Sequence, residues 1–394
     1  MIENFKKYKW GDLCSLEYGK SLRNYQDRED KYPVYGSSGS IGFYNKPLSN
    51  EPGVIVSRKG TLGVHYSEKP FYVIDTAFWL KPKNKIKIDL LWAYYSILNF
   101  QVKNLKTGTG VPSLSRDDFY DLDVYLPEYE YQKKIAQFLY KFDQNININL
   151  KKNKLVRNAL DMTFNKIFYN FESLNISSKK TKLNDFLKKD FPDDWIMKKF
   201  GDILSDLESG DRPKGGINKQ EIAIPSIGAE NIIKVGSYNY LNEKYVTEKF
   251  FKNLKKGIVK SNDVLMYKDG ASLGRASYFK NGFPHDECCV NSHVFILRTN
   301  NLLNQEYLYM WLEQDFMKRI IFKIGVKAAQ PGINQEDVND LPILVPSKNY
   351  LDLFETKSKN LFDKIFNNSL QNKFLSNYRN WLLPMIINGQ IKLS

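Results

Sequence analysis

Cysteine and histidine are scarce in this chain, with three of each among 394 residues. The cysteines, Cys14, Cys288 and Cys289, are odd in number and two are adjacent, which argues against a disulfide framework and indicates a reducing compartment. Zinc ligands usually pair about two to four residues apart, a spacing that Cys288 and Cys289 do not offer. His285 and His293 lie nearby, but strand alternation would split these ligands between two faces. We therefore expect no metal site.

Long apolar runs are also missing. No stretch approaches the roughly 18 consecutive apolar residues that a membrane-spanning helix needs. The segment Met1–Lys7 lacks the apolar region of a secretory signal. We therefore expect a cytoplasmic protein that does not engage a membrane.

Catalytic motifs are absent as well. The chain has no Asn-Pro-Pro-Tyr or Asp-Pro-Pro-Tyr stretch of the adenine-methyltransferase type. It has no complete phosphate-binding Gly-x-x-x-x-Gly-Lys-Ser/Thr motif, which excludes an ATP motor of that class. Its few histidines do not define a Ser-His-Asp or Cys-His set. The sequence thus predicts no catalytic residue and no cofactor held by this chain.

What remains is the composition of a folded, basic protein. Hydrophobic residues make up 42% of the chain and aromatic residues 14%, which excludes a disordered chain. The net charge is +14 and the isoelectric point is near 9.3. Lysine and arginine gain affinity for phosphates by releasing counterions, although membrane surfaces attract cations too. The charge favours a nucleic-acid partner, and the length allows two or three domains.

The chain contains a long internal repeat. Four positions recur 219 residues later (311 − 92 for the first pair): Trp92 as Trp311, Pro112 as Pro331, Asp121 as Asp340, and Pro127 as Pro346. Solenoid repeats have periods of about 20 to 50 residues, so a whole domain-sized unit is duplicated. Two such units can form a pseudo-twofold object, which suits two oppositely oriented sites on duplex DNA.

The duplicated unit has two parts. The first is of mixed α/β type, with strand candidates at 53–57, 72–80, 264–267 and 290–297 and a helical pattern at 90–105. The second is a long helix, because 128–170 contains neither Gly nor Pro and has apolar residues three and four apart. We predict an α/β domain at 1–127, a helix at 128–172, a linker at 173–192, a second α/β domain at 193–346, and a second helix with a C-terminal tail at 347–394.

Each predicted helix has a polar interruption in its apolar seam. Asn149 and Asn153 fill it in the first helix, and Asn368 and Asn372 fill it in the second. If the helices pack antiparallel about a pseudo-twofold axis, Asn149 faces Asn372 and Asn153 faces Asn368. Buried asparagines would then fix the register of a coiled coil. The alternative is a solvated stretch of a weak seam.

Four groups of motifs follow one another along the chain. They are Tyr32–Tyr44 with Val54–Gly63 and Asp75–Phe78; Leu126–Pro127 with Gln132–Leu139 and Asp143; Pro192–Trp195 with Phe200–Ile203, Gly210 and Ile224–Ile227; and Trp381–Met385 with Asn388–Ile391. In order and duplication they resemble the specificity (S) subunit of a Type I restriction–modification system. The first and third groups are similar to its target-recognition domains, the second to its first spacer helix, and the fourth to its C-terminal ending. The start of the second helix, 347–354, departs from the family pattern.

The resemblance implies two target-recognition domains of mixed α+β fold, joined by two long antiparallel spacer helices in a coiled coil. It implies a non-catalytic subunit that binds a bipartite site in double-stranded DNA, one half per domain. Two modification subunits, which methylate adenine, would dock on the helices, and restriction or translocase subunits are further partners. S-adenosylmethionine, ATP and Mg are expected in those partner subunits and not in this chain.

Candidate DNA-binding residues lie in loops at corresponding places of the two domains. The glycine-rich loop with Ser37, Ser38 and Ser40 either approaches DNA or forms an ordinary tight turn. Arg58 and Lys59 follow a predicted strand. Cations at this place would read guanine or hold a phosphate. The alternative is that they are ordinary solvated side chains. The other candidates are Thr61, Lys106, Thr107, Thr109, Arg212, Lys214, Lys268, Ser272, Arg275, Lys327 and Gln330.

Two alternative functions remain open. A recognition fragment of a fused endonuclease–methyltransferase would belong to a chain with the catalytic motifs that this one lacks. A scaffold that binds only proteins would not need a net charge of +14 or cations in its loops. Duplex binding that weakens as salt rises would separate DNA recognition from the scaffold.

Overall fold

The computed structural model describes residues 5–25, 31–60, 63–83, 85–100, 106–107, 113–170, 181–213, 224–241, 243–326 and 331–393. The chain forms two compact units, the first of residues 1–146 with 374–394 and the second of residues 147–373. The boundary falls inside two 40-residue helices, α4 (Tyr129–Phe168) and α10 (Lys348–Ile387). Each unit therefore combines one α/β domain with parts of both helices.

The first unit is built on a four-stranded antiparallel sheet. Its elements are β1 (Lys6–Lys9), α1 (Trp10–Leu13), β2 (Cys14–Tyr18), β3 (Tyr32–Gly36), β4 (Gly39–Tyr44), β5 (Gly53–Ser57), β6 (Val64–Ser67), β7 (Tyr72–Val73), β8 (Ala77–Pro82), α2 (Leu90–Asn99), β9 (Lys106–Thr107), β10 (Ser113–Leu114), α3 (Arg116–Tyr120) and β11 (Asp123–Leu126). The main sheet has the order β2-β8-β5-β6, beside a three-stranded sheet β4-β3-β7 and the pairs β1-β11 and β9-β10. The side chains of Trp10, Trp92 and Phe119 are fully buried in its core.

The second unit repeats this topology. Its elements are β12 (Thr181–Asn184), β13 (Lys189–Pro192), β14 (Ile196–Lys199), α5 (Phe200–Ile203), β15 (Leu204–Ser209), β16 (Ile224–Ile227), β17 (Ile232–Lys234), β18 (Ser237–Tyr238), β19 (Lys244–Val246), α6 (Glu248–Lys252), β20 (Val264–Tyr267), β21 (Ala276–Tyr278), β22 (Cys289–Val290), β23 (Val294–Thr299), α7 (Gln305–Leu312), α8 (Asp315–Gly325), α9 (Gln335–Asn339) and β24 (Pro342–Val345). The order β15-β23-β20-β21 matches β2-β8-β5-β6, and β19-β16-β22 matches β4-β3-β7. The predicted mixed fold with two similar domains is confirmed.

Two strands predicted as continuous are each broken into two. The run 72–80 forms β7 and β8 in different sheets, and 290–297 forms β22 and β23 in the same way. At both breaks the backbone of a glycine from another segment lies close to the chain. A Cβ on Gly19 would lie 2.0 Å from the Ile74 carbonyl oxygen, and one on Gly210 would lie 1.6 Å from that of Val290. Only glycine fits at either position.

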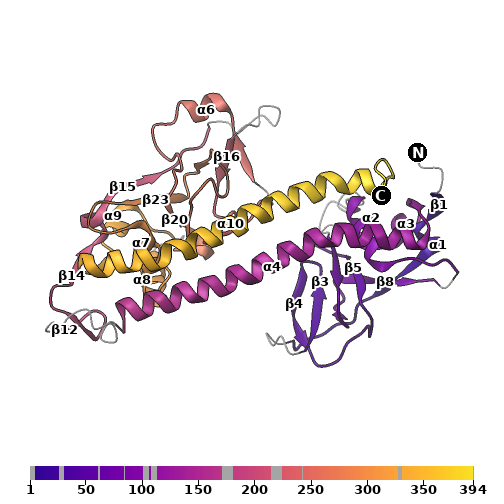
Figure 1. Ribbon diagram of the computed structural model, residues 1–394, viewed down its shortest axis with the longest axis horizontal. Helices are drawn as coiled ribbons and strands as arrows, with labels where there is room; N and C mark the ends of the chain where they lie inside the picture. Colours follow the sequence, from indigo (N-terminus) through magenta and orange to yellow (C-terminus); the bar gives the residue numbers. More distant parts are fainter. Residues whose placement is uncertain are drawn as a thin grey trace. The chain divides into compact units, whose positions relative to one another are not determined.

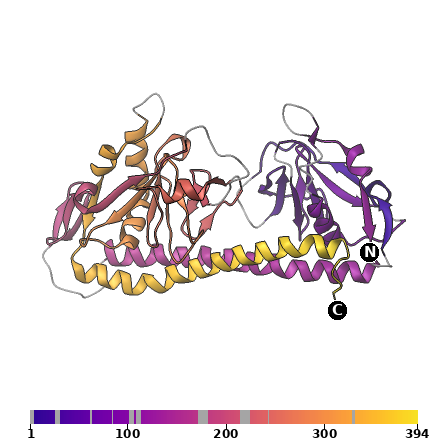
Figure 2. The same ribbon diagram turned by 90° about the horizontal axis from the view of Figure 1, so that it is seen from above.

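Helices α4 and α10 pack antiparallel within each unit (Figure 1). In the first unit Arg379 forms an ion pair with Asp143, and the rings of Phe142 and Tyr378 lie 5.9 Å apart. In the second unit the β-sheets lie on one side of the two helical segments (Figure 2). Within the described residues, no helix is both long enough and apolar enough to cross a membrane.

The second domain is fixed to α10 through the β17-β18 turn. Gly236 has a φ of +66°, and a Cβ there would lie 2.0 Å from Ile365 Cγ2 on the helix. The hydroxyl of Ser369 donates to the Gly236 carbonyl at 2.7 Å, and Arg157 of α4 donates to the neighbouring Val235 carbonyl at 3.2 Å. The turn thus needs glycine both for its backbone conformation and for its close approach to the helix.

The segment predicted as a linker includes regular structure. Residues 181–192 form the antiparallel hairpin β12-β13, while 171–180 lie outside the described residues. Phe191 is 2% exposed and stacks on Trp195, with ring centroids 5.7 Å apart. The polar, lysine-rich composition predicted a linker at 173–192 and gave no prediction of this hairpin.

The four seam asparagines contact one another within the second unit. Asn149 donates to the side-chain oxygen of Asn372 at 2.9 Å, and Asn368 donates to that of Asn153 at 2.8 Å. Asn153 also donates to the Ser369 hydroxyl at 3.0 Å, and it is 1% exposed. These pairs are the ones expected for antiparallel helices, and their role in fixing register remains a prediction.

Replacing Asn153 with leucine should destabilise the second unit. The substitution leaves Asn368 and Ser369 without their buried partner, which costs about 1–3 kcal/mol. The double variant N153L/N368L should lose less than the sum of the single variants, because an apolar pair replaces a polar one. Urea denaturation of the full chain measures both effects, with the exposed Asn147→Leu as control. Strictly additive losses would show that the pair is uncoupled.

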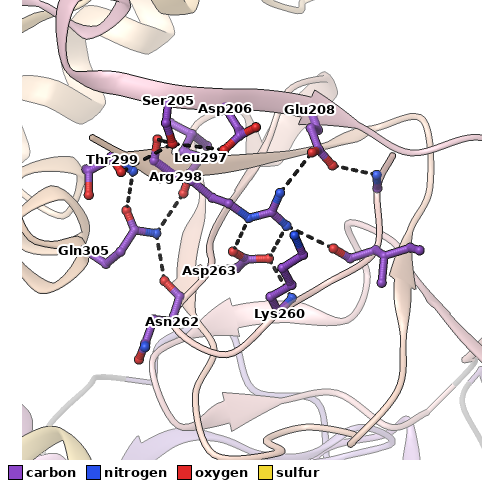
Figure 3. Close-up of polar contacts among 12 residues, drawn as sticks. Ser205, Asp206, Glu208, Lys260, Asn262, Asp263, Leu297, Arg298, Thr299 and Gln305 are labelled. Carbon is purple, nitrogen blue, oxygen red and sulfur yellow. Dashed lines mark hydrogen bonds and ion pairs between the residues drawn. The ribbon is translucent and has the colours of Figure 1, made fainter. Parts of the chain in front are cut away.

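An ion-pair network around the buried Asp263 stabilises the second domain (Figure 3). Arg298 on β23 donates to both carboxylate oxygens of Asp263, at 2.7 and 2.8 Å, and to Glu208 on β15 at 2.9 Å. Asp263 is 2% exposed, and burial raises its pKa although the bonds from Arg298 act to lower it. The network ties the loop before β20 to the two neighbouring strands.

Arg298→Met should lower the free energy of unfolding by about 3–5 kcal/mol, because it leaves the buried Asp263 carboxylate unpaired. The loss should be largest at neutral pH and shrink in acid, because the pKa of Asp263 is raised in the folded state and the proton it takes up removes the unpaired charge. Lys81→Met, at the equivalent exposed position of β8, is the matched control and should change stability by less than about 0.5 kcal/mol. Denaturation of the full chain at several pH values tests this, and equal losses in the two variants would contradict it.

Candidate nucleic-acid interface

Loops from four separate segments meet at one end of the main sheet in the first unit. The Ser57 hydroxyl donates to the Ser37 carbonyl at 2.6 Å, which joins the end of β5 to the β3-β4 turn. The Arg58 amide donates to the Thr76 carbonyl at 2.9 Å, and the Leu114 amide to the Arg58 carbonyl at 2.9 Å. The residues after β5 are therefore held between the β7-β8 turn and the segment before α3.

The β3-β4 turn of this cluster rests on a neutral side chain. Gly39 has a φ of +105°, and a Cβ there would lie 3.3 Å from the His65 ring. His65 Nε2 lies 3.4 Å from the Ser37 carbonyl oxygen. Burial lowers the pKa of His65, so its ring is uncharged at neutral pH. Ser38 and Ser40 are exposed, and their hydroxyls are open to a ligand.

Two arginines converge on an exposed tyrosine beside this turn. The guanidinium carbon of Arg58 lies 5.0 Å from the ring centroid of Tyr18, and that of Arg116 lies 4.6 Å from it. Arg58 also lies 5.9 Å from the Phe78 ring and donates through Nη1 to the Asp75 carbonyl at 2.9 Å. The first unit thus places two guanidinium groups beside one exposed ring.

The second unit builds the same backbone around different side chains. The Lys268 amide donates to the His293 carbonyl at 3.1 Å, and the Ile333 amide to the Lys268 carbonyl at 2.9 Å. Lys268 therefore corresponds to Arg58, and its ammonium lies 5.0 Å from the Phe295 ring. The next residue is Asp269 instead of a lysine, and its carboxylate lies 2.6 Å from His293 Nδ1.

The structure brings together only some of the predicted DNA-binding residues. Ser37, Ser38, Ser40, Arg58 and Lys59 lie in the first cluster, and Lys268 and Ser272 in the second. Exposed Arg275 lies close by, where it donates to the Ser272 hydroxyl at 2.6 Å and to the Ile232 carbonyl at 3.2 Å. Contact with DNA stays a prediction for all of them.

The remaining candidates are less well placed. Arg212 follows β15, close enough for its charge to act on Glu230 and Tyr267. Lys106 and Thr107 form β9, which pairs with Ser113–Leu114, and the structure describes only their backbone. Thr61, Thr109, Lys214, Lys327 and Gln330 lie outside the described residues.

Sequence analysis missed Tyr18 and Arg116. Neither belongs to a repeated motif, and they are 98 residues apart in sequence (116 − 18). The turn signals at Gly19 and after Pro112 indicate only where β2 ends and where α3 begins. Tyr18 and Arg116 come together through the pairing of β2 with β8 and the position of the segment before α3. Residue patterns alone do not reveal either of these.

His285 and His293 each lie beside a carboxylate. His285 Nε2 lies 2.6 Å from Glu243 Oε1, and His293 pairs with Asp269. Cys288 and Cys289 are buried as free thiols, and burial raises the pKa of the Cys289 thiol to about 11. These thiols are therefore protonated at neutral pH.

The family model described as "Type I restriction modification DNA specificity domain" matches residues 2–158 and 192–376. The chain belongs to this family. The family predicted from the ordered motifs is confirmed, and each matched segment contains one α/β domain with part of the long helix that follows it.

Curated relatives and a solved structure agree with this assignment. The MjaIX specificity subunit of Methanocaldococcus jannaschii is 25% identical over 98% of this chain and 89% of its own length. The EcoDI specificity subunit of Escherichia coli is 20% identical over 87% of this chain and 78% of its own length. The crystal structure of a Type I S subunit from M. genitalium has a TM-score of 0.57 at 18% identity, covering 96% of this chain and 95% of that one. This likeness shows that the fold is shared.

Proposed function

We propose that this specificity-subunit chain binds a bipartite site in double-stranded DNA, with each α/β domain recognising one half. The observation that carries the proposal is the duplicated loop cluster, which places a cation directly after the equivalent strands β5 and β20, as Arg58 and Lys268. Arginine and lysine at a strand end can reach base edges or phosphates. The net charge of +14 suits a polyanion ligand.

The two long helices would set the gap between the half-sites. Both α4 and α10 have 40 residues, and a helix of this length spans about 60 Å at 1.5 Å per residue. The asparagine pairs would fix the register in which the helices pack. The length of the paired helices would then determine the gap, and the loops would determine the half-site sequences.

Two modification subunits would dock on the helices. Exposed apolar side chains seven residues apart occur at equivalent places on both helices: Leu155 (68% exposed) and Met162 (73%) on α4, and Phe374 (65%) and Trp381 (56%) on α10. Each pair is separated from the other by 219 residues (374 − 155 and 381 − 162), the offset of the repeat. Large apolar side chains on the outer face of a helix favour a protein partner. Their duplication favours two copies of one partner.

The chemistry would belong to the partner subunits. S-adenosylmethionine would be bound by the modification subunits, and ATP and Mg by restriction or translocase subunits when these join. The chain itself would hold and orient the duplex, so that a partner can extrude the target adenine. A protein-only scaffold would not require the clustered loop cations, and DNA binding that weakens as salt rises would argue against it.

Shortening the helices should change the gap and leave the half-sites unchanged. Removing seven residues from α4 and the seven facing residues from α10 keeps the heptad phase and shortens the helix pair by about 10 Å, or up to about three base pairs. Methylated adenines mapped in DNA exposed to the assembled complex give both quantities. New half-site sequences at an unchanged gap would contradict the proposal.

Docking on these exposed apolar side chains predicts that charged substitutions there change the number of modification subunits bound. L155E/M162E should remove one modification subunit, F374E/W381E the other, and the fourfold variant both, because each charge would be buried in an apolar contact. Native mass spectrometry of the co-expressed complex counts the subunits. Leu150→Glu, at an exposed position on another face of α4, is the control and should keep two. Two subunits bound to the fourfold variant would place docking elsewhere.

A further inference from the structure

The guanidinium of Arg58 is held in one orientation by two aromatic rings and a hydrogen bond. It lies over the rings of Tyr18 and Phe78, and Nη1 donates to the Asp75 carbonyl at 2.9 Å. Stacking on aromatic rings and a fixed hydrogen bond restrict a side chain that otherwise has many rotamers. Arg58 is therefore ordered before a ligand arrives, which lowers the entropy that binding must overcome.

Most of the donors of this guanidinium are still available. Toward the described residues Arg58 uses only Nη1, and no carboxylate among them lies within ion-pair distance of Arg58 or Arg116. Two guanidinium groups beside one exposed ring repel each other unless an anion or a polar ligand is present. Exposed Lys59, Ser38 and Ser40 lie in the same loop cluster. The site has the features of a ligand contact and not of an internal ion pair.

The second unit lacks this arrangement. Ser209 pairs with Phe295 in the β15-β23 ladder, where Tyr18 pairs with Phe78 in the first unit. Gln335 begins α9 where Arg116 begins α3. The side-chain amide nitrogen of Gln335 donates to the Leu207 carbonyl at 2.8 Å. Lys268 replaces Arg58. The second unit thus keeps one cation at this place and loses the tyrosine and the second cation.

We propose that Arg58 recognises a guanine in the half-site bound by the first unit, with Tyr18 as its positioning residue, and that Lys268 contacts a phosphate at the equivalent place in the second. This rests on the proposed DNA-binding function. Arginine presents two parallel N–H groups that match guanine O6 and N7, whereas lysine is a mobile point charge. The fixed plane of Arg58 suits the first kind of contact. The ammonium of Lys268, which has no planar pair of donors, suits the second kind of contact, which carries no sequence information.

The test uses the full chain assembled with its co-expressed modification subunits. Selection from a random duplex library first gives the wild-type site, and dissociation constants are then measured on duplexes in which each guanine of the first half-site is replaced by 7-deazaguanine. One such guanine should weaken wild-type binding, and R58K should lose about 5- to 150-fold in discrimination at that same position. In R58K the 7-deazaguanine substitution should then have no further effect.

Tyr18 and Lys268 provide matched variants. Y18F keeps the ring and should retain the preference, whereas Y18S, which introduces the residue of the second unit, should reduce it without changing the selected sequence elsewhere. K268A should weaken binding to all sequences alike and flatten its salt dependence. Unchanged circular dichroism and subunit stoichiometry would show that each variant is folded.

The outcomes separate the inference from the function on which it rests. If the wild-type complex selects no sequence, the proposed function is wrong. If it selects a bipartite site but the first half-site has no guanine that depends on Arg58, the assignment of Arg58 is wrong. If R58A still selects the wild-type sequence, or weakens binding to all duplexes equally, Arg58 does not read a base and the inference is overturned.

Discussion

The antiparallel pairing of α4 with α10 is the interaction on which both units depend. In the second unit Phe164 and Phe168 of α4 pack against Phe354 of α10, with ring centroids 5.7 and 5.4 Å apart. The same core includes Tyr307 of the α/β domain, 5.5 Å from Phe164. In the first unit Ile135 and Leu382 share a core with Trp92. Each domain therefore buries its apolar face on a helix pair and not on a single helix.

Much of this fold could be predicted from the sequence because it is duplicated. A residue that recurs at a constant offset, such as Trp92 as Trp311, is informative even where a single motif is weak, and the two sheets do share one strand order. The asparagine pairs were predictable for a related reason. Once two seams carry polar residues at equivalent places, antiparallel packing allows only one pairing, and Asn149 does contact Asn372.

Local sequence patterns did not predict the structure where contacts between distant segments determine it. The runs 72–80 and 290–297 look like single strands, yet each is divided between two sheets at a point where the backbone of Gly19 or Gly210 packs against it. The β12-β13 hairpin in the predicted linker is packed through Phe191, whose ring stacks on Trp195. The contacts of Arg58 and Arg116 with Tyr18 join the end of β2, the residue after β5 and the start of α3, which no motif connects. Charge and turn signals identified the loops, but not the side chains that meet on them.

The division of the chain into units has a consequence for biosynthesis. The second unit is one continuous stretch, 147–373, whereas the first needs 374–394 to complete a core that contains Ile135 and Leu382. At about 5–20 residues per second, the ribosome needs roughly 10–50 s to travel from residue 146 to residue 387. During that time the N-terminal domain exposes the apolar helix face that α10 later covers. The domain made first is therefore the last to be finished, and a nascent chain stalled before α10 would present that face to chaperones or to aggregation.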